Sequence, residues 1–387
     1  MRKGKITLLR SAALVLSGII VFMQGSSLAK TEGNEPYFSG LKACAAAELH
    51  TLTVVTESEA DMKLNVAGLA RLPALLFVCE AFDAGKLTND TEVAVSEKAA
   101  AVPGPTAFVR PNERIKAGAL LKAAVMILAG DAITALAETA AGTPEAAAAA
   151  INDRLEQLGL TQRLSSLEDN TGSFSAKDLL ILGKALANSS SFCELSGTFI
   201  DEIEHDNGEK TELVNQNRLL KTVSGCFGIA TGSSGEAGYC GIFGVKRGDS
   251  AYLCVVIGAS SAEERHSKAK ALVEHAFAEY KSKVIVSAGD VVVKDHPIIG
   301  GTQEKVDLIA LEDAVILEKQ GEMYSERLDI QETVRAPLVK TEAVGTLSVL
   351  NGKGEHVLRI RLFPAENVGK AVFFDRVQKI MRYWVHG

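Results

Sequence analysis

The sequence has no excess of positive charge. Its 387 residues include 41 Lys or Arg and 48 Asp or Glu, which gives a formal net charge of -7 at pH 7. Proteins that bind nucleic acids concentrate basic residues on one surface, because they must neutralise phosphate groups. The charge balance therefore argues against a nucleic-acid partner.

Spacings typical of metal and phosphate sites are also missing. None of the six cysteines forms a C-x-x-C pair, and none of the seven histidines stands in an H-E-x-x-H pattern. Glycine-rich stretches at 232–241 and 299–301 lack the strand-loop-helix context of a phosphate loop, so we interpret them as turns. We expect neither a metal site nor a cofactor, and we interpret the histidines as surface or locally hydrogen-bonded groups.

Three of the cysteines fall on segments that look like consecutive strands. Cys226, Cys240 and Cys254 stand at equal intervals and could lie side by side across a sheet. Two interpretations remain open. A disulfide between two of them suits an exported protein, whereas buried free thiols, which we favour, would behave as small core residues.

The N-terminus has the pattern of a secretory signal peptide over residues 1–29. An apolar stretch from Ser11 to Met23 precedes the small residues Ser27-Leu28-Ala29. The positive residues before it are Arg2, Lys3, Lys5 and Arg10. The alternative is an uncleaved anchor, but the stretch is shorter than the roughly 20 apolar residues that a membrane span needs. We therefore expect an exported protein.

Residues 30–282 predict an α+β domain. Apolar residues at helical spacing predict helices over 69–84, 118–128, 131–141, 144–158, 175–188 and 261–281. A strand pair is expected over 43–56, and short strands at 225–232, 238–246 and 251–259. Strands from the two ends of this segment would then meet in one sheet, with helices packed on it.

The pattern changes after this domain. Residues 284–364 are short alternating β segments, which predict a small separate β domain, and residues 366–387 predict a final helix. One face of that helix would hold Phe373, Val377, Ile380, Met381 and Trp384, with basic residues elsewhere around it. Such a basic amphipathic helix suits the membrane surface. The alternative is a helix docked on its own β domain.

Several segments resemble one bacterial family. They are SEADMKL (58–64), EAFDAGKL (80–87), LLKAAVMILAGDAITALAETAAG (120–142) and TGSSGEAGYC (231–240). In this order, they are similar to the low-molecular-weight penicillin-binding proteins, the serine D-alanyl-D-alanine carboxypeptidases of peptidoglycan. The resemblance runs over roughly residues 40–385. It implies an antiparallel sheet with helices on its faces, as in serine β-lactamases, followed by a β domain and a terminal amphipathic helix.

The family's chemistry uses three motifs, and this chain departs from each. In S-x-x-K the Ser attacks the peptide carbonyl and the Lys helps to remove its proton; in register, these positions hold Gly68 and Arg71. Arg keeps the charge but cannot act as a base at neutral pH. The S-x-N motif becomes Leu128-Ala129-Gly130, and K-T-G becomes Ala230-Thr231-Gly232, which loses the cation.

Other serines and lysines in the sequence are poor candidates to replace the missing catalytic groups. A literal S-x-x-K occurs at Ser267 to Lys270, but we interpret it as a solvated helix face, because the family places its motif much earlier in the chain. Ser233 and Ser234 follow the third motif and read as turn residues. Losing a serine nucleophile costs on the order of a millionfold in turnover.

Three functional hypotheses follow. We favour an inactive homologue at the outer face of the cytoplasmic membrane, or secreted, that binds peptidoglycan or its stem peptide or acts as a scaffold. It would contact the membrane through residues 366–387. The alternatives are an active carboxypeptidase with relocated catalytic groups, and an envelope protein whose β domain carries the function.

Overall fold

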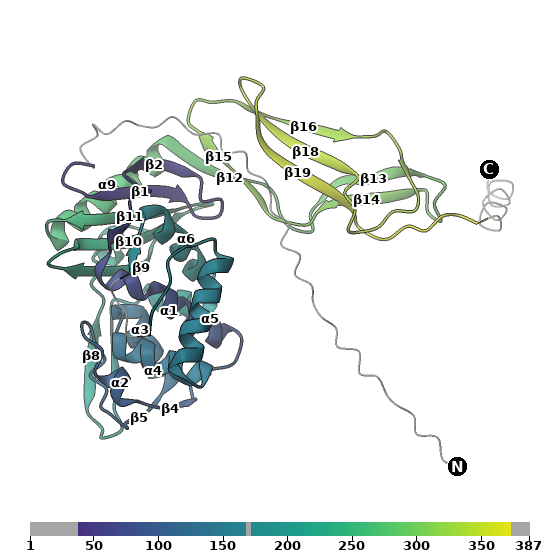
Figure 1. Cartoon of the computed structure of the whole chain (residues 1–387). Coiled ribbons are helices and arrows are strands. Elements are labelled where there is room, and N and C mark those ends of the chain that lie inside the picture. The colour runs from purple at the N-terminus through teal and green to yellow at the C-terminus, as the bar shows by residue number, and fades with distance from the viewer. Residues whose placement is uncertain (1–37, 168–171, 373–387) are drawn as a thin grey trace, which may run out of the picture.

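A computed structural model describes residues 38–167 and 172–372 of the chain (Figure 1). The predicted signal peptide (1–29) lies outside the described residues. So does the predicted amphipathic helix from residue 373 onward.

A five-stranded antiparallel sheet forms the centre of the first domain, and its strand order is β2-β1-β11-β10-β9. These strands are β1 (Ala43–Glu48), β2 (Val54–Ser58), β9 (Cys226–Ser234), β10 (Gly238–Arg247) and β11 (Ser250–Ala259). Strand β1 pairs with β11, and Ala43 lies opposite Ile257. The two ends of the domain therefore meet in one sheet, as the sequence predicted, and the α+β fold is confirmed.

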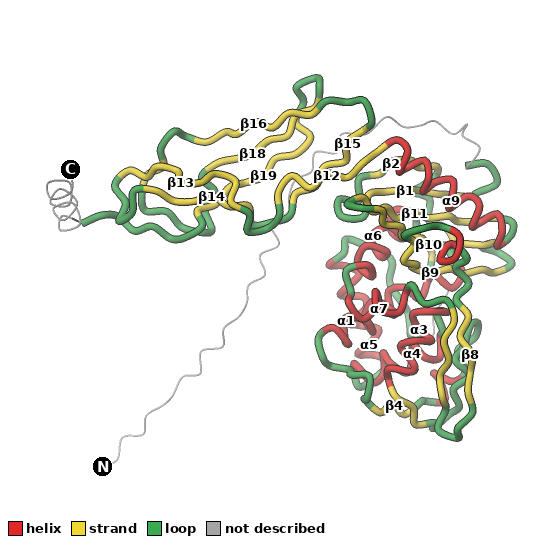
Figure 2. Tube along the Cα trace, turned by 180° about the vertical axis from the view of Figure 1, so that it is seen from behind, coloured by secondary structure: helices red, strands yellow, loops and turns green. Residues whose placement is uncertain are grey.

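Helices cover both faces of this sheet, and Figure 2 shows most of them gathered on one side. On that side lie η1 (Ala67–Arg71), α1 (Leu72–Asp83), α2 (Glu97–Ala100), α3 (Ala117–Ile127), α4 (Gly130–Ala141), α5 (Pro144–Gln157), α6 (Ala176–Ala187) and α7 (Ser190–Ser196). Helix α9 (Ala262–Glu279) covers the opposite face, and the short α8 (Leu219–Thr222) packs there too. Because β11 is covered on both faces, almost every residue of SAYLCVVIGA is buried.

Local signals in the sequence account for the ends of these helices. The Thr143 hydroxyl accepts a hydrogen bond from the Ala146 N–H at 3.1 Å, and Pro144 takes the first position of α5. At the start of α6, Ser175 and Asp178 form a capping box. These polar caps satisfy N–H groups that the first turn of a helix leaves without partners.

Three two-stranded ladders complete the first domain. They are β3 (Leu64–Asn65) with β6 (Ser173–Phe174), β4 (Glu92–Ala94) with β5 (Arg114–Lys116), and β7 (Ile200–Glu204) with β8 (Lys210–Val214). These ladders and the short helices α2, α7 and α8 were not among the elements expected from the sequence. The β7–β8 hairpin is rich in acidic residues and buries few of its side chains, so its alternation is weak.

The remaining strands form a β domain that extends away from the first domain (Figure 1). Its larger sheet has the order β16-β18-β19-β14-β13-β17, and β12 pairs separately with β15. The bounds are β12 (Tyr280–Val286), β13 (Val291–Ile299), β14 (Lys305–Ala310), β15 (Ala314–Lys319), β16 (Tyr324–Ile330), β17 (Val334–Arg335), β18 (Gly345–Asn351) and β19 (His356–Pro364). Strand β12 follows α9 directly, so β structure begins at 280, earlier than the expected 284.

The predicted start of the final helix is wrong. Residues 366–372 are not helical, and Val368 and Lys370 form isolated antiparallel bridges to Leu338 and Gly301. The backbone of this stretch forms hydrogen bonds with neighbouring β segments, whereas the backbone of a helix forms its hydrogen bonds within the helix. Among the described residues, no helix has both the length and the apolar character needed to cross a membrane.

All six cysteines, every one of them within the described residues, are free thiols. Cys240 packs on the face that carries most helices, whereas Cys254 packs on the face under α9. The strand registers place Gly232 opposite Cys240 and Phe243 opposite Cys254. Cys226, Cys240 and Cys254 are therefore not cross-strand partners. The interpretation as buried free thiols is confirmed for Cys240 and Cys254, whereas Cys226 is a free thiol that is only partly buried.

Candidate functional site

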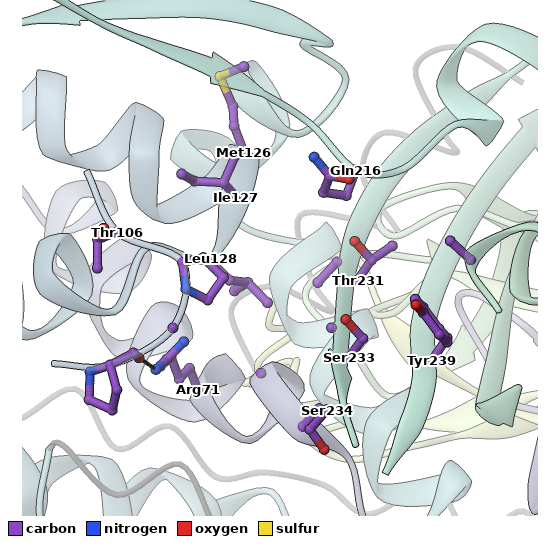
Figure 3. Close-up of a pocket in the computed structure, with 18 of the residues that line it drawn as sticks. Arg71, Thr106, Met126, Ile127, Leu128, Gln216, Thr231, Ser233, Ser234 and Tyr239 are labelled. Carbon is purple, nitrogen blue, oxygen red and sulfur yellow. Dashed lines mark hydrogen bonds between the residues drawn. The ribbon is translucent and has the colours of Figure 1, made fainter. Parts of the chain in front are cut away.

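A cavity of about 970 Å³ lies between the exposed edge of the sheet and the helices, and residues from all three motif positions line it. Gly68 and Arg71 come from η1, Leu128 from the end of α3, and Ala230 to Gly232 from the edge strand β9. Figure 3 shows Arg71 and Leu128 on one side of this cavity, with Thr231 and Ser233 on β9 across from them. The fold thus brings together positions that are more than 160 residues apart.

Gly68 leaves an open space at the nucleophile position. A β carbon placed there would meet only the Gly232 Cα within 4 Å, at 3.8 Å, which is ordinary van der Waals contact. From the other side, a β carbon on Gly232 would lie 2.9 Å from the Gly68 nitrogen, too close for a rigid backbone. Position 232 therefore requires glycine, whereas position 68 has room for a side chain and lacks one.

Arg71 and Gly130 fit together sterically. The Arg71 side chain is 5% exposed, and its guanidinium donates a hydrogen bond to the Pro103 carbonyl. A β carbon on Gly130 would lie 3.0 Å from the Arg71 Cζ. Although Gly130 does not line the cavity, it makes room for the guanidinium. Burial lowers the pKa of Arg71, and the charge of Asp131 opposes that shift.

Asp131, the residue after Gly130, is a buried carboxylate that organises one wall of the cavity. Its side chain accepts hydrogen bonds from the Ala107 N–H at 2.9 Å and from the Val109 N–H at 3.3 Å. Burial raises the pKa of Asp131 above its usual value, and these backbone hydrogen bonds oppose that shift only in part. The loop 103–109 is thereby held against the start of α4.

Arg265 also lines the cavity, although it was not among the site residues expected from the sequence. It projects from α9, is 3% exposed, and its Nη1 donates to the Gly232 carbonyl at 3.4 Å and the Cys240 carbonyl at 3.3 Å. Its Nε has no hydrogen-bond partner, and no described carboxylate forms an ion pair with it. Burial lowers the pKa of Arg265 to about 10, so the group stays charged at neutral pH. Nothing in its sequence spacing marks this arginine.

The hydroxyl groups of the cavity lack a base of the kind that the family uses. Thr106, Thr231, Ser233, Ser234 and Tyr239 line it, yet none of the described lining residues is Lys or His. The two cations in the lining, Arg71 and Arg265, are guanidinium groups that cannot accept a proton at neutral pH. Ser267 and Lys270 lie on α9 and are not part of the lining. Within the described residues, no group of His, Cys, Asp and Glu could hold a metal ion.

The α+β domain, with its cavity at the sheet edge, and the β domain behind it define a two-part architecture that known proteins share. The family model for D-alanyl-D-alanine carboxypeptidases matches residues 39–261, and that for the penicillin-binding protein 5 C-terminal domain matches residues 280–370. The first match covers more than half of the chain. The chain belongs to the D-alanyl-D-alanine carboxypeptidase family.

Relatives match along nearly the whole chain. The D-alanyl-D-alanine carboxypeptidase DacF of Bacillus subtilis is 28% identical, over 96% of this chain and 98% of its own length. DacC of Escherichia coli is 28% identical, over 84% of this chain and 83% of its own. The crystal structure of penicillin-binding protein 5 from Haemophilus influenzae superposes with a TM-score of 0.75 at 20% identity, covering 86% of this chain and 98% of that one. This last match shows a shared fold.

Proposed function

We propose that this protein is a catalytically inactive member of its family that binds peptidoglycan stem peptides. The observation that carries the proposal is the cavity, which has glycine at the nucleophile position and no Lys or His in its described lining. Acyl-enzyme chemistry needs a nucleophile and a group that takes its proton. The loss of a serine nucleophile costs on the order of a millionfold in turnover.

The hydroxyl groups that remain do not change this conclusion. The expectation that Ser233 and Ser234 are turn residues is wrong, because they are the last two residues of strand β9 and pair with Tyr239 and Gly238 on β10. The Ser234 hydroxyl accepts a hydrogen bond from the Ala237 N–H at 3.0 Å across the turn that follows. Glu236 also lines the cavity, but its carboxylate accepts from the Asn65 amide at 3.1 Å, and no hydrogen bond links it to a described hydroxyl of the lining. The guanidinium groups of Arg71 and Arg265 cannot serve as bases.

A binding role is supported by the charge of Arg265. A buried cation without a carboxylate partner is costly, and an anionic ligand group would offset that cost. The C-terminal carboxylate of a stem peptide is such a group, and Thr231 on the edge strand offers a hydroxyl close by in the same cavity. We therefore place the peptide carboxylate beside Arg265 and Thr231.

The test compares two peptides and one antibiotic. We expect the protein to bind a pentapeptide ending in D-Ala-D-Ala, measured by calorimetry. The same peptide with a C-terminal amide should bind at least tenfold more weakly, because a charge-assisted hydrogen bond is lost. A labelled penicillin should form no covalent adduct by intact mass, and no D-alanine should be released. Adduct formation or release of D-alanine would instead support an active enzyme with relocated groups.

Its location and domain organisation are part of the same proposal. Residues 1–29 have the pattern of a signal peptide, and membership of a family that acts on peptidoglycan supports a place in the cell envelope. We propose a carboxypeptidase-like domain that ends with α9 at Glu279, a β domain that begins with β12 at Tyr280, and a membrane contact near the C-terminus. Protease accessibility in intact cells and fractionation of a chain truncated after 372 would test export and membrane contact.

A further inference from the structure

Phe108 is an exposed aromatic residue on an unusual backbone. Its side chain is 72% exposed, and it lines the candidate cavity. Its φ is +60°, in the left-handed region that residues with a bulky side chain rarely adopt. Single exposed apolar residues are common on protein surfaces, but a strained backbone beneath one at a cavity indicates that the surrounding structure imposes its position.

The buried carboxylate of Asp131 imposes this position. The Ala107 N–H and the Val109 N–H both donate to Asp131, which is 1% exposed. The side chains of Ala107 and Val109 are themselves buried, at 0% and 5% exposure. Because both neighbours of Phe108 are held inward, the residue between them is turned outward. The loop thus presents an aromatic ring most of whose surface remains exposed to solvent.

The cavity around this ring suits a ligand larger than a dipeptide. Its volume of about 970 Å³ is at the upper end of the range for small-molecule sites. Exposed polar side chains, Glu212 and Gln216, line it together with Thr106. An aliphatic peptide side chain would favour an enclosed apolar pocket. An open aromatic face with hydrogen-bonding groups nearby suits a ring that has one C–H face and polar substituents at its edge.

We propose that Phe108 is a stacking platform for a sugar ring of the peptidoglycan glycan, attached to a stem peptide in the same cavity. This inference rests on the proposed function, since it assumes that the cavity takes a peptidoglycan fragment. It adds the glycan to the ligand, and it assigns that part of the ligand to one residue.

The test compares two probes on the full chain. One is a disaccharide pentapeptide of peptidoglycan, and the other is the same pentapeptide without sugars. Phe108→Leu keeps apolar volume but removes the flat ring, and it should weaken binding of the disaccharide probe by about three- to tenfold, if stacking on a sugar is worth about as much as stacking between aromatic rings. Binding of the pentapeptide should change less than twofold. Phe108→Trp should keep both affinities, and Met323→Ala, which removes another exposed apolar side chain (80% exposed) on the β domain, should change neither.

Each other outcome has a definite meaning. If Phe108→Leu weakens both probes equally, the ring contacts peptide and the glycan assignment is wrong. If it weakens neither, Phe108 is not a binding residue, although the proposed function stands as long as the wild-type protein binds the pentapeptide. If the wild-type protein binds neither probe, the proposed function fails and this inference fails with it.

Discussion

Replacing Gly68 by serine should restore the nucleophile position without restoring the reaction. A β carbon at position 68 meets only the Gly232 Cα, at 3.8 Å, and the φ of Gly68 is not in the left-handed region. The hydroxyl of Gly68→Ser therefore enters open space. We expect the free energy of unfolding to change by less than about 1 kcal/mol, because replacing glycine at a permissive site costs no strain.

The chemistry should stay absent because the neighbouring cation cannot take the serine proton. Arg71 is buried and donates to the Pro103 carbonyl. Its guanidinium stays protonated at neutral pH. Groups that act as a unit are not additive, and the loss of one can cost nearly as much as the loss of all, on the order of a millionfold. Serine alone should therefore recover almost nothing.

The assay is acylation by a labelled penicillin, followed by intact mass, together with thermal unfolding. The wild-type protein and Gly68→Ser should show no adduct, whereas Gly68→Ser combined with Arg71→Lys should accumulate one slowly. An adduct on Gly68→Ser as fast as on the double variant would refute the argument that Arg71 blocks the reaction. A fall in Tm of more than about 4 °C for Gly68→Ser would refute the argument that position 68 has room.

Three further variants test other contacts. Gly232→Ala places a β carbon 2.9 Å from the Gly68 nitrogen, so it should lower the free energy of unfolding by about 1–3 kcal/mol, measured by urea unfolding. The matched Gly68→Ala should leave that free energy nearly unchanged, and equal losses for the two variants would contradict the close contact between positions 68 and 232. Burial and the charge of Arg265 lower the pKa of His266 from 6.5 to about 4. The unfolded state then binds more protons between these values, so stability should fall by about 3 kcal/mol as pH drops from 6.5 to 4. In His266→Gln, stability should no longer fall between pH 6.5 and 4. A slope equal to that of the wild-type protein would contradict the assignment of this pH dependence to His266. Asp131→Asn replaces an oxygen that accepts backbone N–H groups, and should cost about 1–3 kcal/mol by urea unfolding; wild-type stability would show that the loop does not depend on this carboxylate.

Much of the first domain could be predicted because its elements carry strong local signals. Helix α5 has a Thr143 cap and Pro144 at its first position, and the strands β9 to β11 are short apolar runs separated by glycine-rich turns. Such patterns are properties of neighbouring residues. The hairpin β7–β8 escaped prediction because only Ile203 and Leu213 within it are fully buried, which leaves little periodicity to detect.

The sequence by itself determined which side chains are missing, since Gly68, Arg71 and Ala230 can be read from the chain against the family's motifs. Only the tertiary structure decided which groups meet. It packs η1 against β9, so that Gly232 must be glycine. It also brings Arg265 from the opposite face of the sheet to the cavity and turns Phe108 outward. The physical reason is that these placements depend on contacts between segments far apart in the chain, and no local pattern records such contacts.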